Sequence, residues 1–351
     1  MTNKRLYSIC MISYNQERYI ADAVRGALNQ TFEPIEIVIS DDCSTDNTFD
    51  IIKNTIKEYR GPHHIILNRN ISNLGIAANR SVAFSLATGD WIVSQDCDDI
   101  SLPDRIRIID NAINNYEGLS MIATSYYSID EKSNIVASVP LNINHNLLLL
   151  TGATFAYRRD IHDKFGNLGK GCLDDVVLLF RALLLGKALV IDTPTVLNRE
   201  NSDFFYYLKK ELGYWEDIRR SYNQRSIDLE LISPSLNKDV YRVMKKNNDK
   251  YIEQVHSEAF HLAYDRKKEV VNIYNEKNIA KILRNICISQ SFTFTEKIKL
   301  FALSFKYFRL LKQQILNALI IRKPFSNDEL LISIDDLISQ KIKLVTINDV
   351  N

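Results

Sequence analysis

The sequence lacks the features that mark disulfide-stapled, zinc-binding and membrane-spanning domains. Its five cysteines are odd in number and widely spaced, and no CxxC pair occurs, which argues against a disulfide framework and a zinc knuckle. The long uncharged run at residues 133–157 is interrupted by Pro140, His145 and several asparagines, so it is not the apolar stretch of about 18 residues that spans a bilayer. The apolar run near the start ends by Ser13, too short for a signal peptide. We therefore expect a cytoplasmic protein.

The chain also lacks a large excess of positive or negative charge, because its formal net charge is only +1. No chain-wide field argues for nucleic acid as a partner. Residues 204–323 nevertheless carry 23 Lys and Arg residues against 13 Asp and Glu residues. Within them, residues 296–325 form a basic amphipathic pattern, which is typical of a helix in the interface of an anionic membrane and equally of a helix packed on its own protein. Peripheral membrane contact and simple packing both remain open.

The first hundred residues alternate between short β-prone runs and segments with helical spacing. Strands are expected at 6–13, 35–40, 63–68 and 91–95, and helices at about 17–28, 45–59 and 76–87, with Asn15 as the N-cap of the first helix. Such alternation with short links predicts an α/β fold, a mostly parallel Rossmann-like sheet flanked by helices. Glycine nearly vanishes after residue 204, so we expect a catalytic domain at 1–203 and a helical C-terminal extension at 204–351.

Polar residues follow each of the four expected strands. They are Ser13, Tyr14 and Asn15 after the first, Asp41 and Asp42 after the second, Asn68 in the third and Asp96 after the fourth. Ligands of open α/β sheets bind beyond the carboxyl ends of the strands. The sequence therefore predicts one site where these groups converge.

The stretch "QDCDD" supplies a DxD pattern, Asp96 and Asp98, directly after a strand. Two carboxylates at this spacing can share a hard divalent cation, Mn²⁺ or Mg²⁺, which prefers oxygen ligands and keeps positions for phosphate oxygens. A calcium-binding EF-hand loop is excluded, because Ser101 and Arg107 stand where that loop needs glycine and glutamate.

Five segments in order resemble the inverting glycosyltransferases of family 2, with their GT-A catalytic domain, a class that builds bacterial surface polysaccharides. The segments are "ISYNQERYI", "NQTFEPIEIVISDDCSTDNT", "NRNISNLGIAANRSVAFSLATGDWI", "QDCDDISLPDRI" and "CLDDVVLLFRALLLG". They cover roughly residues 5–202. The resemblance implies a nucleotide-sugar half at about 1–117 and an acceptor half at about 118–203.

The resemblance also implies roles for individual residues. Tyr14, flanked by Ser13 and Asn15, would lie against the nucleotide base, and Asp42 would read its edge. Asn73, Gly75 and Asn79 would line the nucleotide pocket. Asp96 would face ribose and metal, and Asp98 would ligate the metal that bridges the two phosphates. The family often carries an Arg-x-His motif near the end of the domain, of which this chain retains only Arg199.

Asp174 and Asp175 match the acidic pair of the family's "EDxxxxxR" pattern, with Arg181 in the matching place. In that pattern the second acid, Asp175, is the general base that takes a proton from the acceptor hydroxyl. One carboxylate base without a carboxylate nucleophile gives inversion. The same pair is also typical of acids that cap a helix, and the two roles are compatible.

The resemblance implies an enzyme that moves a sugar from a UDP- or dTDP-sugar donor to a glycan or lipid-linked acceptor. Two alternatives belong to other classes. A nucleotidyltransferase that makes the sugar nucleotide would carry a glycine-rich loop where "SYNQERY" stands. A catalytically silent glycan-binding module would not need Asp42, Asp96, Asp98 and Asp175, all of which are intact.

Overall fold

The computed structural model describes residues 5–139, 152–199, 204–236 and 238–255, with short pieces at 284–285, 287–289 and 342–345. Strands β1 (Tyr7–Ser13), β2 (Glu36–Asp41), β3 (His64–Arg69) and β4 (Trp91–Asp96) alternate with helices α1 (Ile20–Leu28), α2 (Thr48–Lys57) and α3 (Ile76–Leu86). Helix α1 begins five residues after Asn15, with Tyr19 at its N-cap position, so the prediction that Asn15 caps this helix is wrong.

Residues 100–199 add strands of both directions. Its elements are β5 (Ile100–Ser101), α4 (Arg105–Asn115), β6 (Leu119–Ile129), β7 (Ile135–Val139), β8 (Phe155–Arg158), α5 (Asp160–Phe165), α6 (Asp174–Leu185) and β9 (Lys187–Arg199). Helices α7 (Phe204–Ile232) and α8 (Lys238–Val255) follow, and β10 is Ile342–Val345. Within the described ranges, no helix is both long enough and apolar enough to cross a bilayer.

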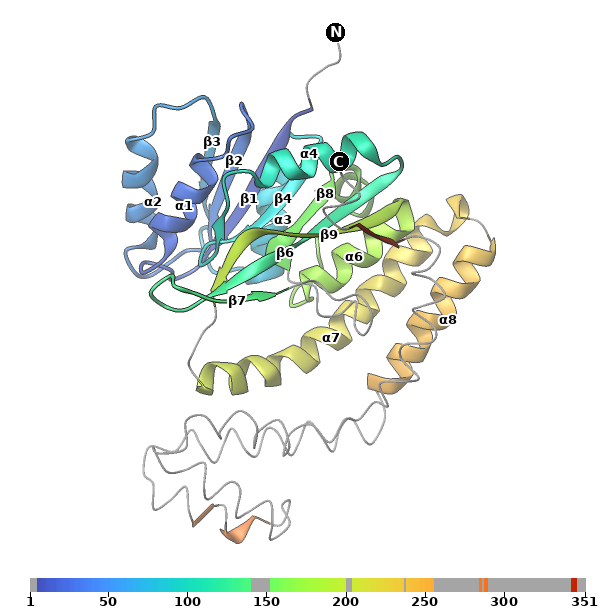
Figure 1. Cartoon of the computed structure of the whole chain (residues 1–351). Coiled ribbons are helices and arrows are strands. Elements are labelled where there is room, and N and C mark those ends of the chain that lie inside the picture. The colour runs from blue at the N-terminus through green and yellow to red at the C-terminus, as the bar shows by residue number, and fades with distance from the viewer. Residues whose placement is uncertain are drawn as a thin grey trace.

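All these strands join one ten-stranded sheet with the main order β10-β9-β6-β8-β4-β1-β2-β3 (Figure 1). β1 pairs in parallel with β2 and β4, and β2 with β3, whereas β8 runs antiparallel between β4 and β6. The expected mostly parallel α/β sheet is confirmed. The antiparallel β8 is the feature that the alternation of strands and helices did not indicate.

Helices cover both faces of the sheet because successive side chains of a strand point to opposite faces. Tyr7, Ile9 and Met11 of β1 pack in a core with α1, α2 and α4, whereas Cys10 and Ile12 pack in a second core with α3, α5 and α6. Residues of α7 and α8 also belong to the second core, and Figure 1 shows α7 running along α6. These two helices are therefore part of the same packed body.

Candidate active site at the strand ends

The carboxyl ends of β1, β2 and β4 lie side by side, as the polar residues after each strand predicted. Ser13 is in register with Asp41, and Ile12 with Asp96. β1 stands between β2 and β4. The chain runs from β1 to β2 and β3 on one side and then crosses back to β4 on the other side of β1. Such a reversal of strand order is where open α/β sheets bind ligands.

The loops after β1 and β2 are tied together by hydrogen bonds. Asn15 adopts a left-handed conformation with φ 53°, and its side-chain oxygen accepts the Thr45 backbone N–H at 2.8 Å. Ser44 in turn accepts the Asn15 backbone N–H at 3.0 Å. Tyr14, next to Asn15 in the same loop, remains 45% exposed. The fixed loops therefore present one aromatic ring to solvent beside the strand ends.

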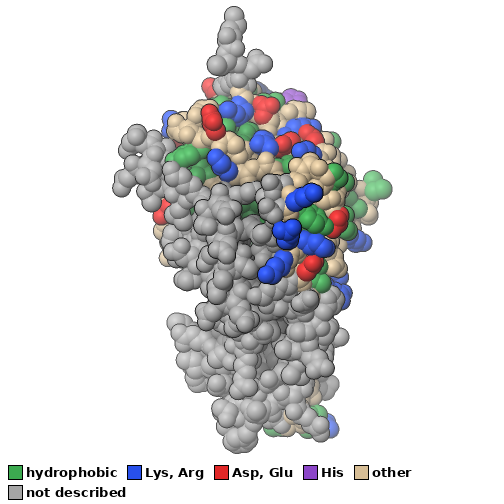
Figure 2. All heavy atoms as spheres, turned by 90° about the vertical axis from the view of Figure 1, so that its right-hand side faces the viewer, with side chains coloured by type: hydrophobic (Ala, Val, Ile, Leu, Met, Phe, Trp, Pro, Cys, Tyr) green, Lys and Arg blue, Asp and Glu red, His purple; other side chains and the backbone are tan. Residues whose placement is uncertain are grey.

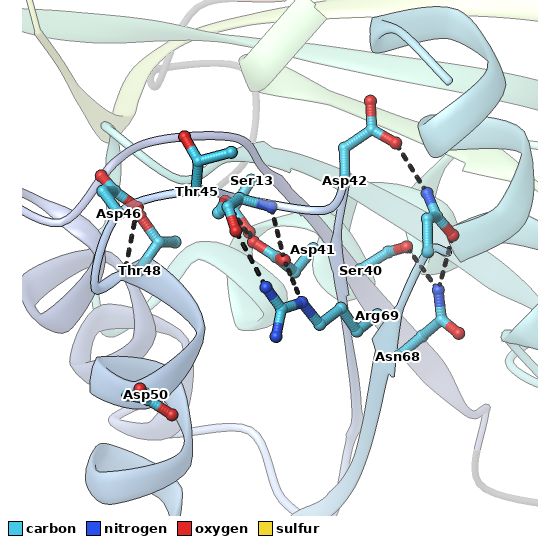
Figure 3. A network of polar contacts seen from close by, with 12 residues as sticks. Ser13, Ser40, Asp41, Asp42, Thr45, Asp46, Thr48, Asp50, Asn68 and Arg69 are labelled. Atoms are coloured by element: carbon cyan, nitrogen blue, oxygen red, sulfur yellow. Dashed lines mark hydrogen bonds and ion pairs between the residues drawn. The ribbon is translucent and has the colours of Figure 1, made fainter. Parts of the chain in front are cut away.

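Two neighbouring acids after β2 point in different directions. Asp41 is fully buried and pairs with Arg69, while Asp42 points away from it (Figure 3). The Asp41 carboxylate also accepts the Ser13 hydroxyl at 3.2 Å and the Ser44 backbone N–H at 3.0 Å. Asp41 thus fixes the base of this loop, a role that sequence reasoning did not assign to it.

Asp42 holds the loop before α3. One of its oxygens accepts the Leu74 backbone N–H at 2.9 Å and the Asn70 side-chain amide at 2.8 Å, and the other accepts the Gly75 N–H at 2.8 Å. Gly75 sits at φ +87° with nothing near its absent Cβ, a conformation that favours glycine. The contact joins Asp42 to the "NLG" segment, which the resemblance had grouped with it.

Asn79 and Asn73 have different environments. Asn79 is buried, where it accepts the Ser40 hydroxyl at 2.6 Å and donates to the Ser40 carbonyl at 3.0 Å. It therefore ties α3 to β2. Asn73 lies exposed in the loop ahead of Gly75. The structure brings the loop to the site but turns the Asn79 amide into the protein.

The DxD loop after β4 is anchored by its third acid and by Arg199. Buried Asp99 accepts the Asn198 side-chain amide and the Arg199 backbone N–H, both at 2.8 Å. The Arg199 guanidinium donates to the Asp98 carbonyl at 3.1 Å and stacks 4.3 Å from the ring centroid of Tyr19. Burial first, and then the charges of Asp98 and Asp96, raise the pKa of Asp99 well above its usual value.

The donor set fits a hard cation that is only partly ligated by protein. Within the described ranges, no group of three or more His, Cys, Asp or Glu side chains is placed to hold a metal. Asp96 and Asp98 offer carboxylate oxygens at a strand end, and the Asp96 side chain is 38% exposed. Mg²⁺ is characteristically bound by one or two carboxylates together with substrate phosphates and waters.

Arg80 on α3 joins this loop to the acidic pair. Its side chain is 3% exposed, its Nη2 donates to Asp96 at 2.7 Å, and its Nε forms an ion pair with Asp174. A further nitrogen donates to the Ser94 hydroxyl. Burial acts to lower the pKa of Arg80, but the carboxylates of Asp174 and Asp96 outweigh it and raise the pKa. Sequence reasoning missed this residue.

Asp174 and Asp175 form the first turn of α6, after Leu173 at the N-cap position. No side chain caps this helix, so the interpretation of the pair as the cap is wrong, although both acids face the positive end of the helix dipole. Asp175 accepts the backbone N–H of Val176 at 2.8 Å. Burial first, and the charge of Asp174 second, raise the pKa of Asp175 to about 7.

Comparisons with known proteins find similarity to glycosyltransferases. The family model "Glycosyl transferase family 2" matches residues 8–166. The putative glycosyltransferase EpsE of Bacillus subtilis is 32% identical over 137 residues, which are 38% of this chain and 49% of that protein. The UDP-Glc:alpha-D-GlcNAc-diphosphoundecaprenol beta-1,3-glucosyltransferase WfaP of Escherichia coli is 36% identical over 149 residues, 41% of this chain and 55% of that one. The chain spans about half the length of these curated relatives.

Solved structures show the same fold. The crystal structure of S. aureus TarS 1–349 in complex with UDP-GlcNAc superimposes with a TM-score of 0.55 at 16% identity, covering 96% of this chain and 93% of that one. A mannosyltransferase from Pyrobaculum calidifontis in complex with GDP-Man and Mn²⁺ gives 0.50 at 14% identity, covering 90% and 85%. Residues 8–166 are therefore similar to glycosyl transferase family 2, and the solved structures show that the chain has the GT-A fold.

Proposed function

We propose that the protein is an inverting, metal-dependent glycosyltransferase of bacterial polysaccharide biosynthesis. The observation that carries this proposal is the meeting of two acidic motifs. Asp96 of the DxD loop and Asp174 of the acidic pair bind the same buried arginine, Arg80. The proposed site for a diphosphate-bound cation would therefore adjoin the proposed proton acceptor, as sugar transfer from a nucleotide requires.

The donor half would bind the nucleotide between the loops after β1, β2 and β4. Exposed Tyr14 would stack on the base, and Asp42 with the loop around Asn73 and Gly75 would border the pocket. The Asp42 oxygens already accept three N–H groups of the protein. Backbone groups of the surrounding loops would therefore share in the recognition of the nucleotide base. Ser13, Asn15, Asn79 and Arg199 would act by holding these loops in place.

The acceptor half would carry out the proton transfer. As the acceptor hydroxyl oxygen bonds to the anomeric carbon, the bond to the diphosphate breaks and its electrons pass to the phosphate oxygen. The hydroxyl proton passes to the Asp175 carboxylate. Asp174 is engaged by Arg80, which leaves Asp175 as the base of the pair. Mn²⁺ or Mg²⁺ held by Asp96 and Asp98 would neutralise the charge that develops on the leaving diphosphate.

The donor is proposed to be a UDP- or dTDP-sugar and the acceptor a glycan or a lipid-linked saccharide. TarS was solved with UDP-GlcNAc, and the name of WfaP specifies a UDP-glucose donor and a diphosphoundecaprenol-linked acceptor. Release of nucleoside diphosphate from a panel of sugar nucleotides, with Mn²⁺ or with a chelator, tests the proposal. We expect chelator-sensitive release that rises when a lipid-linked saccharide is added. Pyrophosphate-dependent formation of sugar nucleotide would instead indicate a nucleotidyltransferase.

Replacement of Asp98 by alanine should weaken metal-dependent nucleotide binding. The variant loses one of the two carboxylates available to the cation, while the loop keeps its anchors because Asp99 and Arg199 still bind each other. Calorimetric titration with UDP measures the effect, with and without Mn²⁺. We expect the Mn²⁺-dependent gain in affinity to vanish and the metal-free affinity to persist. An unchanged gain would refute the metal assignment.

A peripheral position at the inner face of the cell membrane is proposed from the sequence alone. The basic amphipathic segment 296–325 lies outside the described residues, so the proposal rests on its pattern of Lys and Arg opposite Leu, Ile and Phe. Co-sedimentation of the full chain with vesicles containing anionic lipid should be seen at low salt and lost at high salt, because the attraction is screened. Absence of binding at low salt would rule the proposal out.

A further inference from the structure

Arg80 contacts both acidic motifs of the site. It projects from the middle of α3, away from either motif in sequence, and is nine-tenths or more buried. Its Nη2 binds the Asp96 Oδ1 at the end of β4, and its Nε pairs with the Asp174 Oδ2 at the start of α6. The Ser94 hydroxyl of β4 accepts from its Nη1. Three separate elements therefore meet at one guanidinium.

The chemistry of this contact requires arginine. A guanidinium is planar and presents its donors in a fixed fork, so the hydrogen bond to Asp96 also fixes the side of the group that forms the ion pair with Asp174. The ammonium of a lysine is a compact point charge on a flexible stem and does not impose that orientation. A buried cation of this kind also costs free energy unless it is paired. Stability alone would be served as well by an apolar side chain.

We propose that Arg80 is a positioning residue that holds the donor-side DxD loop and the acceptor-side acidic pair in one geometry. The proposal rests on the function proposed above. By fixing Asp96 and Asp174 on a single cation, Arg80 sets where the leaving diphosphate lies relative to Asp175. A misplacement of about 1 Å between reacting groups can lower a rate by about 10²-fold.

Arg80 also sets the electrostatic environment of Asp175. The charged or titratable groups that act on Asp175 are Asp174 on α6, Arg80 on α3, Asp96 on β4 and Tyr157 on β8. Asp174 and Asp96 raise the pKa of Asp175, and Arg80 lowers it. Removal of the Arg80 charge should therefore raise the pKa of Asp175, and removal of the Asp174 charge should lower it. The upward shift on removal of the Arg80 charge measures the electrostatic effect of Arg80 on Asp175.

Steady-state kinetics of an Arg80→Lys variant test the geometric part of the proposal. We expect kcat to fall by about 10²-fold with a much smaller change in the donor KM and with a preserved fold. Arg158→Lys is the matched control, because Arg158, at the end of β8, makes a bidentate and partly exposed pair with Asp160 at 2.8 and 2.7 Å. This control should keep the wild-type kcat. Wild-type kcat in Arg80→Lys, beside an active wild type, would overturn the proposal and leave the proposed function standing.

Carboxyl carbon-13 NMR titration tests the electrostatic part without turnover. In chain labelled at aspartate, the Asp175 signal is assigned by its loss in Asp175→Asn. Arg80→Met should move its titration midpoint up in pH, and Asp174→Asn should move it down. Should Arg80→Met fail to fold, the kinetics of Arg80→Lys beside Arg158→Lys still decide the role of Arg80. An inactive wild type would refute the proposed function, whereas an Asp175 midpoint that does not move in Arg80→Met would refute the electrostatic effect of Arg80.

Discussion

Asp175→Asn should lower the rate of glycosyl transfer by about 10²- to 10⁴-fold, the usual contribution of a positioned general base. The substitution removes the proton-accepting oxygen and keeps the size of the side chain. Its carbonyl oxygen can still accept the Val176 N–H that Asp175 Oδ1 accepts at 2.8 Å, so the first turn of α6 should keep its geometry. Nucleotide binding should persist, because the strand-end loops around Asp42 and Asp96 lie on other elements.

Turnover and nucleotide binding, measured on the same preparation, separate loss of the base from loss of the fold. Asp163→Asn is the matched control, since Asp163 is an exposed acid in the first turn of α5. We expect that variant to keep wild-type turnover. Full activity of Asp175→Asn would show that another group accepts the proton.

The pH dependence of the wild type should report the same group. Burial and the charge of Asp174 raise the pKa of Asp175 to about 7. A general base acts in its unprotonated form, so kcat/KM for the acceptor should fall as the pH decreases through this value and level off above it. An Asp with an ordinary pKa would keep the enzyme fully active to about pH 5. A profile flat from pH 8 to pH 5 would contradict the assignment.

The fold and the donor-side acids were predictable because their signals are local. Alternating apolar strands and helices indicated the parallel sheet, and acids after apolar strands indicated the rim where Asp42 and Asp96 lie. Asp99, the acid that follows the DxD pattern, secures this loop through its bonds to Asn198 and Arg199. The roles of the individual site residues in nucleotide, metal and proton binding remain predictions.

Ion pairs between residues far apart in the sequence were not predictable, because the identity of one charged residue does not indicate which distant residue the fold brings next to it. Arg80 stands on a helix face with buried Ala77 and Phe84, and a lone arginine on such a face was the available signal. Its partners lie 16 and 94 positions away, at Asp96 and Asp174. The left-handed Asn15 was likewise read as a helix cap, because Asn is typical of both positions.

The sequence placed α7 in a C-terminal extension, but its contacts bear directly on the acidic pair. Arg181 of α6 and Asp228 of α7 form a buried bidentate ion pair at 2.8 and 3.0 Å. The Ser221 hydroxyl of α7 accepts the backbone N–H of Leu173 at 2.7 Å, one residue before Asp174. Gly169, in the same loop, lies so close to α7 that a Cβ there would stand 2.6 Å from Gln224. The loop that leads into the acidic pair is therefore held by α7.

Asp228→Leu should lower the free energy of unfolding by about 3–5 kcal/mol, the usual cost of leaving one charge of a buried pair uncompensated. Arg181 would remain buried, with the backbone carbonyl of Gly166, at 2.8 Å, as an acceptor that carries no charge. Denaturant unfolding of the full chain measures the loss. Asp217→Ala is the control, because its pair with Arg220 is 32–42% exposed and should contribute about 0–1 kcal/mol.

The double variant Arg181→Met/Asp228→Leu separates the ion pair from the packing of α7 on α6. Replacement of both charges by apolar groups of similar volume is often neutral or stabilising, so the double variant should recover most of the stability that Asp228→Leu loses. Because α7 would then pack as before and Ser221 would still bind Leu173, transfer activity should recover with it. If the single variant is as stable as wild type, the pair does not hold α7. If the double variant is stable but inactive, the Arg181 charge itself acts on the acidic pair, in addition to joining the two helices.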